Sequence, residues 1–247
     1  MQYFGTISTK YEEVFLTSSY LYFNDDENEI TPKEFKEKIN NTKLKKKNIA
    51  GTIIIYNPVV TPKGYDSNKF LLDQDFDSFD ELIELKSENY LTTFKHALRE
   101  NYKGKIVEIV NLFNLIEKNI DSSNLLTKFN EDLEKYNSMQ NTEFDREIMY
   151  LDAANYIPTG KFVFLCWGDK IKQSEFPYIH DYARTLFDNF HKLGKNVLYV
   201  YKEEKGTEHS EQYLQFSFPD QNPKYRNAIE NAIKKAFKEI PPSKTFY

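Results

Sequence analysis

Three apolar runs of this chain are each followed by residues that could bind a ligand. The dipeptide Asn57-Pro58 follows the run 51–56, Asn111 follows the run 105–110, and Trp167-Gly168 ends the run 161–166. An Asn amide can donate and accept hydrogen bonds at once, but it cannot take up a proton as a carboxylate does. These residues could therefore recognise a polar group or orient a water molecule, and Asn57-Pro58 could equally begin a turn.

The three apolar runs have the composition of strands that are buried on both faces of a parallel sheet. In open α/β sheets, ligands bind at the edge formed by the carboxyl ends of the strands. The polar residues that follow the runs are therefore expected to lie at one edge of the sheet, where they could form a single site.

The segments between the runs predict the helices of an α/β fold. Amphipathic patterns and end signals predict helices at 84–101, 122–137, 143–155 and 176–193, followed by a fourth strand at 196–201. Alternation of strands and helices gives a parallel sheet with right-handed crossovers. We expect a three-layer α/β sandwich with a central, mainly parallel sheet.

The two ends of the chain predict additions to this sheet within one domain. β-Branched and aromatic residues predict an N-terminal strand pair at 2–8 and 14–23, and Thr31-Pro32 begins a short helix that ends near residue 40. A strand at 212–218 and a helix at 223–239 are expected near the C-terminus. The single domain comprises an N-terminal region at 1–48, the core at 49–225 and a C-terminal helix region at 226–247.

Composition limits the classes of partner. The net charge of −5 and the pI near 5.6 argue against a dedicated nonspecific DNA-binding protein, because no overall basic field would attract a polyanion. The only cysteine, Cys166, lies in an apolar run, which favours core packing and a reducing cytoplasm. No run reaches the roughly 20 apolar residues that span a bilayer, so we expect a cytoplasmic protein without membrane contact.

No metal or cofactor site is expected. The acidic residues Asp73, Asp75, Asp77 and Asp80 have alternate spacing, but the segment lacks the central glycine and terminal glutamate of a calcium loop. The lysine-rich run 43–47 is read as a solvated surface, as most charge runs are.

Three motifs together resemble the uracil-DNA glycosylase superfamily. They are Ile-Ile-Tyr-Asn-Pro at 54–58, Ile-Val-Asn-Leu-Phe at 109–113 and Phe-Val-Phe-Leu-Cys-Trp-Gly at 162–168. Their order and spacing look closer still to the branch named domain of unknown function 1643, over about residues 49–225. The resemblance implies a glycosylase-like fold that binds a nucleobase, a nucleotide or a single-stranded nucleic acid.

The resemblance also implies roles for individual residues. Asn57 would orient the water that attacks an N-glycosidic bond, next to Pro58, and Asp66 is the acidic residue that follows. Asn111 would read the edge of an extruded base. Phe113 either stacks on that base or belongs to the core.

Trp167 and Gly168 would pack the strand end and admit a close approach of the ligand to the backbone. The family ends in a His-Pro-Ser or Asn-Pro-Ser motif that stabilises the leaving base. Here the nearest elements are Phe218-Pro219 and Asn222-Pro223, so His209 is the remaining candidate for that role. Loss of the residue that stabilises the leaving base would remove an electrostatic contribution of roughly 2.7–4 kcal/mol.

Two hypotheses follow. The first is a glycosylase-like module that binds a base or nucleotide at the strand ends and hydrolyses an N-glycosidic bond. The second is a noncatalytic protein that keeps the fold and binds another protein, for example in phage–host conflict.

Overall fold

The fold is given by a computed structural model of the 247-residue chain. It describes residues 1–10, 13–24, 28–40, 48–56, 63, 82–86, 91, 94, 102–116, 126–131, 133–134, 151–160, 162–167 and 175–199. The expected strand at 212–218 and helix at 223–239 lie outside these residues.

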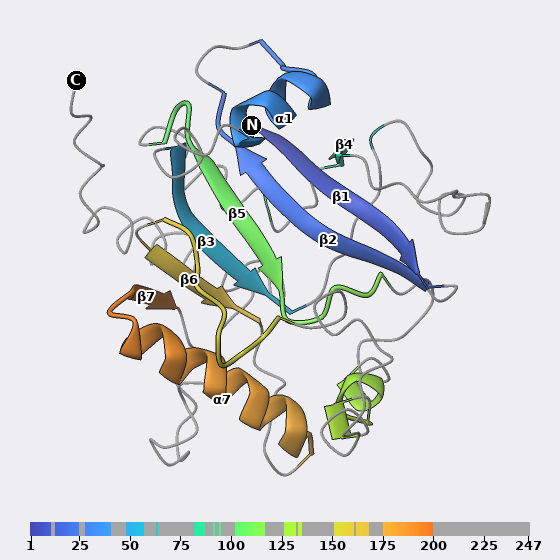
Figure 1. The fold of residues 1–247 in the computed structure, drawn as a ribbon, viewed down its shortest axis with the longest axis vertical. Helices are drawn as coiled ribbons and strands as arrows, with labels where there is room; N and C mark the ends of the chain where they lie inside the picture. The colour runs from blue at the N-terminus through green and yellow to red at the C-terminus, as the bar shows by residue number, and fades with distance from the viewer. Residues whose placement is uncertain are drawn as a thin grey trace, which may run out of the picture.

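One open sheet carries the described strands, in the order β4-β1-β2-β5-β3-β6-β7 (Figure 1). The elements are β1 (Gln2–Lys10), β2 (Glu13–Tyr22), α1 (Pro32–Asn40), β3 (Ile49–Ile55), β4 (Leu82–Leu85), β5 (Ile106–Asn111), β6 (Phe162–Cys166), α7 (Pro177–Lys192) and β7 (Asn196–Tyr199).

The sheet has a parallel half and an antiparallel half that meet at β5. Strands β5, β3, β6 and β7 are parallel, whereas β2 pairs antiparallel with β5, and β1 pairs antiparallel with β2 and β4. The expected α/β class is confirmed. The sheet is mixed, because the N-terminal strand pair joins the parallel core directly and β4 adds another antiparallel strand.

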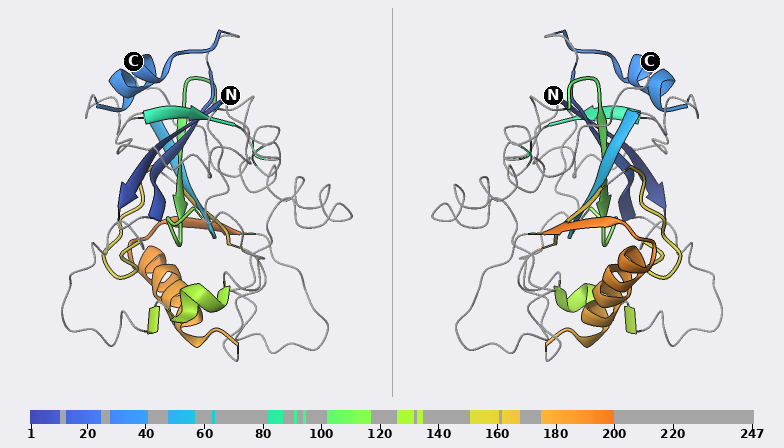
Figure 2. Two further views of the ribbon diagram at one scale, coloured as in Figure 1. Left: turned by 90° about the vertical axis from the view of Figure 1, so that its right-hand side faces the viewer. Right: turned by 90° about the vertical axis from the view of Figure 1, so that its left-hand side faces the viewer.

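Alternate side chains of the parallel strands enter two different cores. Ile53 and Phe164 belong to one cluster and Ile54 to the other, as expected for the two faces of a sheet. Helical residues Leu91 and Phe94 pack on the first face, and α7 packs on the second (Figure 2). Burial of both faces explains why these strands read as unbroken apolar runs.

Two predicted helix boundaries were wrong. Glu84 and Leu85 lie in β4, which pairs with β1, so the helix predicted at 84–101 does not begin at residue 84. Residues 151–155 form an irregular segment with a turn, so the helix predicted at 143–155 does not reach them. Tertiary pairing decided the first case, because a short apolar segment next to an open strand gains a hydrogen-bonded partner.

Helix α1 begins as its sequence predicts. The backbone N–H of Thr31 donates to Glu34 Oε2 at 2.7 Å, and the Glu34 N–H donates to Thr31 Oγ1 at 3.3 Å. This reciprocal capping pair satisfies two backbone donors at the helix start. Phe35 is buried under the helix and stacks on Phe4 of β1, which fixes α1 against the antiparallel half.

Helix α7 takes its N-terminal cap from a distant segment. Asn130 Oδ1 accepts hydrogen bonds from Tyr178 N at 3.0 Å and from Ile179 N at 3.4 Å. The cap therefore links α7 to the helical residues near position 130. None of the described helices is both long and apolar enough to span a membrane.

A close backbone contact joins the start of β3 to the segment before β6. Gly160 has φ +80°, and a Cβ placed on it would lie 2.5 Å from the backbone nitrogen of Gly51. A side chain at residue 160 would therefore meet both an unfavourable dihedral angle and backbone atoms that cannot move aside.

We predict that Gly160→Ala lowers the free energy of unfolding by roughly 2–5 kcal/mol, through the dihedral cost and the steric overlap together. Gly194→Ala is the matched control, since Gly194 has φ +64° but no atom within 4 Å of the place that a Cβ would occupy. The control should lose only roughly 1–2 kcal/mol. Urea unfolding measures both, and equal losses would contradict the steric explanation.

Cys166 gives a second test of the packing. Its side chain is fully buried, and burial raises the pKa of the thiol well above its ordinary value. Because the thiolate is the reactive form, we expect a thiol reagent at pH 8 to leave the native protein unmodified. In denaturant the same reagent should label one thiol per chain. Rapid labelling of the native protein would contradict the packing of β6.

Candidate functional site

A break in the pairing of β2 with β5 shapes a pocket that described residues line. Ser19 pairs with Ile109, and Phe15 forms an isolated bridge with Leu115. Between these two points, residues 16–18 of β2 lie opposite the longer run 110–114. The longer run must bulge, which separates the two backbones locally.

The pairing of β5 with β3 continues past this break. Leu112 N donates to Ile55 O at 2.9 Å, and Phe113 N donates to Tyr56 O at 3.1 Å. The chain after Asn111 therefore stays attached to β3 while it leaves β2. The gap opens on the side of β5 that faces the N-terminal strands.

A second irregularity lies directly beside the gap, in β2 itself. Thr6 pairs with Ser18 and Ile7 pairs with Leu16, which leaves Thr17 as the extra residue of a β-bulge. The exposed Thr17 donates from Oγ1 to Thr6 O at 3.2 Å. Bulges of this kind redirect side chains and commonly lie next to functional sites.

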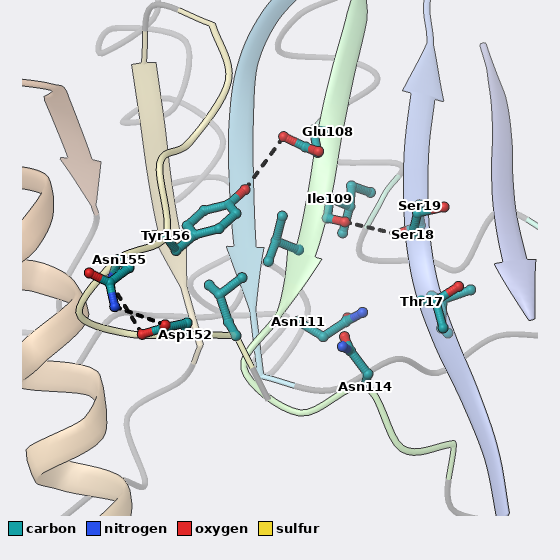
Figure 3. Close-up of a pocket in the computed structure, with 13 residues that line it drawn as sticks. Thr17, Ser18, Ser19, Glu108, Ile109, Asn111, Asn114, Asp152, Asn155 and Tyr156 are labelled. Atoms are coloured by element: carbon teal, nitrogen blue, oxygen red, sulfur yellow. Dashed lines mark hydrogen bonds between the residues drawn. The ribbon is translucent and has the colours of Figure 1, made fainter. Parts of the chain in front are cut away.

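The resulting pocket, called here the β2–β5 pocket, has a volume of about 380 Å³ (Figure 3). The segment 151–156 forms its wall opposite the two strands. Described residues that line it are Leu16, Thr17, Ser18, Ser19, Glu108, Ile109, Val110, Asn111, Asn114, Leu151, Asp152, Asn155 and Tyr156. This size and the mixed polar and apolar lining suit a small ligand that carries polar groups.

Asn111 is the most informative side chain of the pocket. Only 2% of its surface is exposed, and its Oδ1 atom has no hydrogen-bond partner. A buried acceptor without a partner costs about 1–3 kcal/mol. A ligand that donates a hydrogen bond to Oδ1 would recover this free energy, so the predicted site residue on β5 does line a pocket.

Glu108 lies on the same strand and places a carboxylate in the pocket. Its Oε2 atom accepts hydrogen bonds from Thr159 Oγ1 and from Tyr156 OH at 3.5 Å, and Thr52 Oγ1, which donates to Thr159 O at 2.9 Å, lies 3.4 Å from it. Hydroxyl groups of the segment 151–160 therefore fix the orientation of this half-buried carboxylate beside β3. Figure 3 shows Tyr156 pointing across the pocket wall toward Glu108.

Burial and the Glu108 carboxylate act together on two neighbouring tyrosines. Desolvation, with the nearby charge of Glu108, raises the pKa of Tyr20 to about 12. The same two causes raise the pKa of Tyr156 above its ordinary value. Both phenols therefore stay protonated at physiological pH.

The segment 151–160 is held in place by its own turn and by α7. Asp152 Oδ1 accepts from Ala154 N and Asn155 N, and Asn189 Nδ2 of α7 donates to Tyr156 O at 2.9 Å. These bonds make the pocket wall a fixed part of the fold.

The aromatic residues predicted at the strand ends are buried. Phe113 is fully buried and stacks on Phe129 at a centroid distance of 3.8 Å, and Tyr56 contacts both rings edge-on. Trp167 packs in the same cluster, with 2% of its surface exposed. In this arrangement Phe129 covers one face of the Phe113 ring. The base-stacking role of Phe113 remains a prediction that requires this cluster to open.

Five other predicted site residues lie outside the described part of the chain. They are Asn57, Pro58, Asp66, Gly168 and His209. Their proposed roles therefore remain predictions.

Sequence reasoning missed Glu108, Asn155 and Tyr156. Glu108 had a usable signal, because it is the only charged residue of the strand Ile106–Asn111. The other two residues gave none, since Asn155 was expected to end the helix 143–155 and Tyr156 follows it directly. Within the described residues, no group of three or more His, Cys, Asp or Glu side chains is arranged to hold a metal ion.

Comparison with known proteins does not assign a family. No protein-family model, curated protein or solved structure matches this chain.

The cost of burying Asn111 can be measured directly. We predict that Asn111→Leu leaves the free energy of unfolding unchanged or raises it by about 1 kcal/mol, because it removes an unpartnered acceptor. Thr52→Val is the control with similar burial. Thr52 donates to Thr159 O at 2.9 Å, so its loss should cost about 1 kcal/mol. A loss of more than about 2 kcal/mol in Asn111→Leu would show that Asn111 serves the fold.

Proposed function

We propose that this protein is a glycosylase-like module that binds a nucleobase, alone or within a nucleoside, nucleotide or single strand, in the β2–β5 pocket. The observation that carries the proposal is the unpartnered, buried Oδ1 of Asn111 at the carboxyl end of β5. Polar groups buried without a partner are rare in folded proteins, and a ligand is one of the few explanations for them.

The chemistry of the pocket suits a heterocycle with polar edges. An amide that can donate and accept pairs with the edge of a base, and Thr17 and Ser18 belong to the same pocket lining. The volume of about 380 Å³ falls at the lower end of the range for small-molecule sites, which suits a base or nucleoside.

Hydrolysis of an N-glycosidic bond is the reaction that the resemblance to uracil-DNA glycosylases implies. Ile55, which pairs with Asn111 across β3 and β5, precedes Asn57 by two positions in the sequence. An amide at residue 57 could orient water but could not accept its proton, so Asp66 is the proposed base. This step rests on the resemblance and on residues outside the described part of the chain.

One observation favours the noncatalytic alternative. The buried rings of Phe113 and Trp167 and the partly buried ring of Tyr56 pack in one cluster at the ends of β3, β5 and β6. Under this alternative the fold is retained for binding another protein, and base ligands do not bind.

Binding can be tested with the purified chain and a panel of bases, nucleosides, nucleotides and short single strands. At about 100 times its dissociation constant, a true ligand should stabilise the wild type by roughly 2.7 kcal/mol. Asn111→Ala should weaken binding about 10–100-fold, the loss of a good amide–base pair. Lys192→Ala, an exposed change on α7, is the control and should bind as the wild type does.

Turnover is measured separately, as release of free base from the ligand that binds. Asn57→Ala and Asp66→Asn should abolish release while binding persists. Failure of every member of the panel to stabilise the wild type would overturn the proposal and favour the noncatalytic alternative.

A further inference from the structure

We infer that the β2–β5 pocket selects a base that carries an exocyclic amino group, as a free base or nucleoside, over a uracil-type base and over a nucleotide phosphate. This inference rests on the proposed function and specifies its ligand. It is carried by the hydrogen-bonding character and the charge of the pocket lining.

The pocket presents acceptors and negative charge. Glu108 and Asp152 contribute carboxylates, and Asn111, whose buried Oδ1 atom has no partner, is among the lining residues. The described lining residues include no Lys, Arg or His side chain. A phosphate placed here would face carboxylates with no cation among these residues, so a phosphorylated ligand is disfavoured.

One oxygen of Glu108 is already used, and the other is left for a ligand. Tyr156 and Thr159 donate to Oε2, the Thr52 hydroxyl lies 3.4 Å from the same oxygen, and no hydrogen bond between described residues reaches Oε1. Figure 3 shows the Glu108 carboxylate on the side of β5 toward Tyr156, and Asn111 lower on the same strand, beside Asn114. The fixed carboxylate can accept a hydrogen bond from a ligand without changing its orientation.

The neighbouring phenols do not offset this acceptor character. Tyr156 already directs its hydroxyl toward Glu108, and desolvation keeps both Tyr156 and Tyr20 protonated. Asp152 accepts hydrogen bonds from its own turn. A donor for Glu108 Oε1 and for Asn111 Oδ1 is therefore expected from the ligand.

Amino-bearing bases supply such donors. Carboxylates pair with the exocyclic amine of cytosine, and Asn pairs with the amine edge of adenine. Uracil and hypoxanthine present a carbonyl oxygen at the equivalent position, which would face Glu108 acceptor to acceptor. Selection would thus come from a repulsive contact as well as an attractive one.

The test is isothermal titration of the wild-type chain with matched pairs. Cytosine and cytidine are compared with uracil and uridine, adenosine with inosine, and cytidine with cytidine monophosphate. The inference predicts at least tenfold tighter binding of each amino-bearing ligand than of its carbonyl counterpart, and weaker binding of the monophosphate than of cytidine.

Glu108→Gln supplies the residue-level test, because Gln keeps the size and can also donate. It should reduce the preference for cytidine over uridine at least tenfold. Glu37→Gln removes the same charge from an exposed position of α1 and should leave the preference unchanged. The wild-type comparison stands even if Glu108→Gln fails to fold.

The outcomes separate the two proposals. Equal or tighter binding of uridine and inosine would overturn this inference and leave the proposed base-binding function intact. A Glu108→Gln effect that is equal for cytidine and uridine would also overturn it, because Glu108 would then contact the ribose. Absence of binding by every ligand would overturn the proposed function and this inference with it.

Discussion

The double role of β5 is the constraint on which the site depends. One side of this strand must keep a parallel register with β3, and the other must pair antiparallel with β2. After Asn111, Leu112 and Phe113 keep their hydrogen bonds to Ile55 and Tyr56, and the chain diverges from β2. The bulge at Thr17 interrupts the regular pairing of β2 with β1 at the same level. The pocket is the space that these two departures leave, so its position follows from backbone pairing.

The polar groups of the pocket are held by the sheet and by its covering segment. Glu108 occupies a strand position whose neighbours are apolar, and hydroxyl groups of Thr52, Tyr156 and Thr159 compensate part of its desolvation. Asn111 receives no such compensation at Oδ1. A carboxylate that is held at one oxygen, together with an amide whose Oδ1 has no partner, indicates a site in which one polar group is oriented in advance and another awaits a partner.

The position of the pocket differs from the one that open parallel sheets usually offer. Ligands of such sheets bind where the strand order reverses, here between β3 and β6. The buried Trp167 and the partly buried Tyr56 occupy the described portion of that region. The β2–β5 pocket lies instead at the boundary between the parallel and antiparallel halves. The proposed relation to glycosylases therefore involves a site built partly from the N-terminal strand pair.

The sequence by itself determined the elements whose signals are local. The buried parallel strands follow from their apolar runs, and the start of α1 follows from Thr31 and Glu34, because capping involves residues three apart. Asn111 was identified because it ends such a strand. Only the tertiary structure decided the pairing of β4, the cap of α7 by Asn130 and the meeting of Glu108 with Tyr156. Each of these joins segments far apart in the chain, and no local pattern encodes which distant backbone or hydroxyl group will satisfy a buried polar atom.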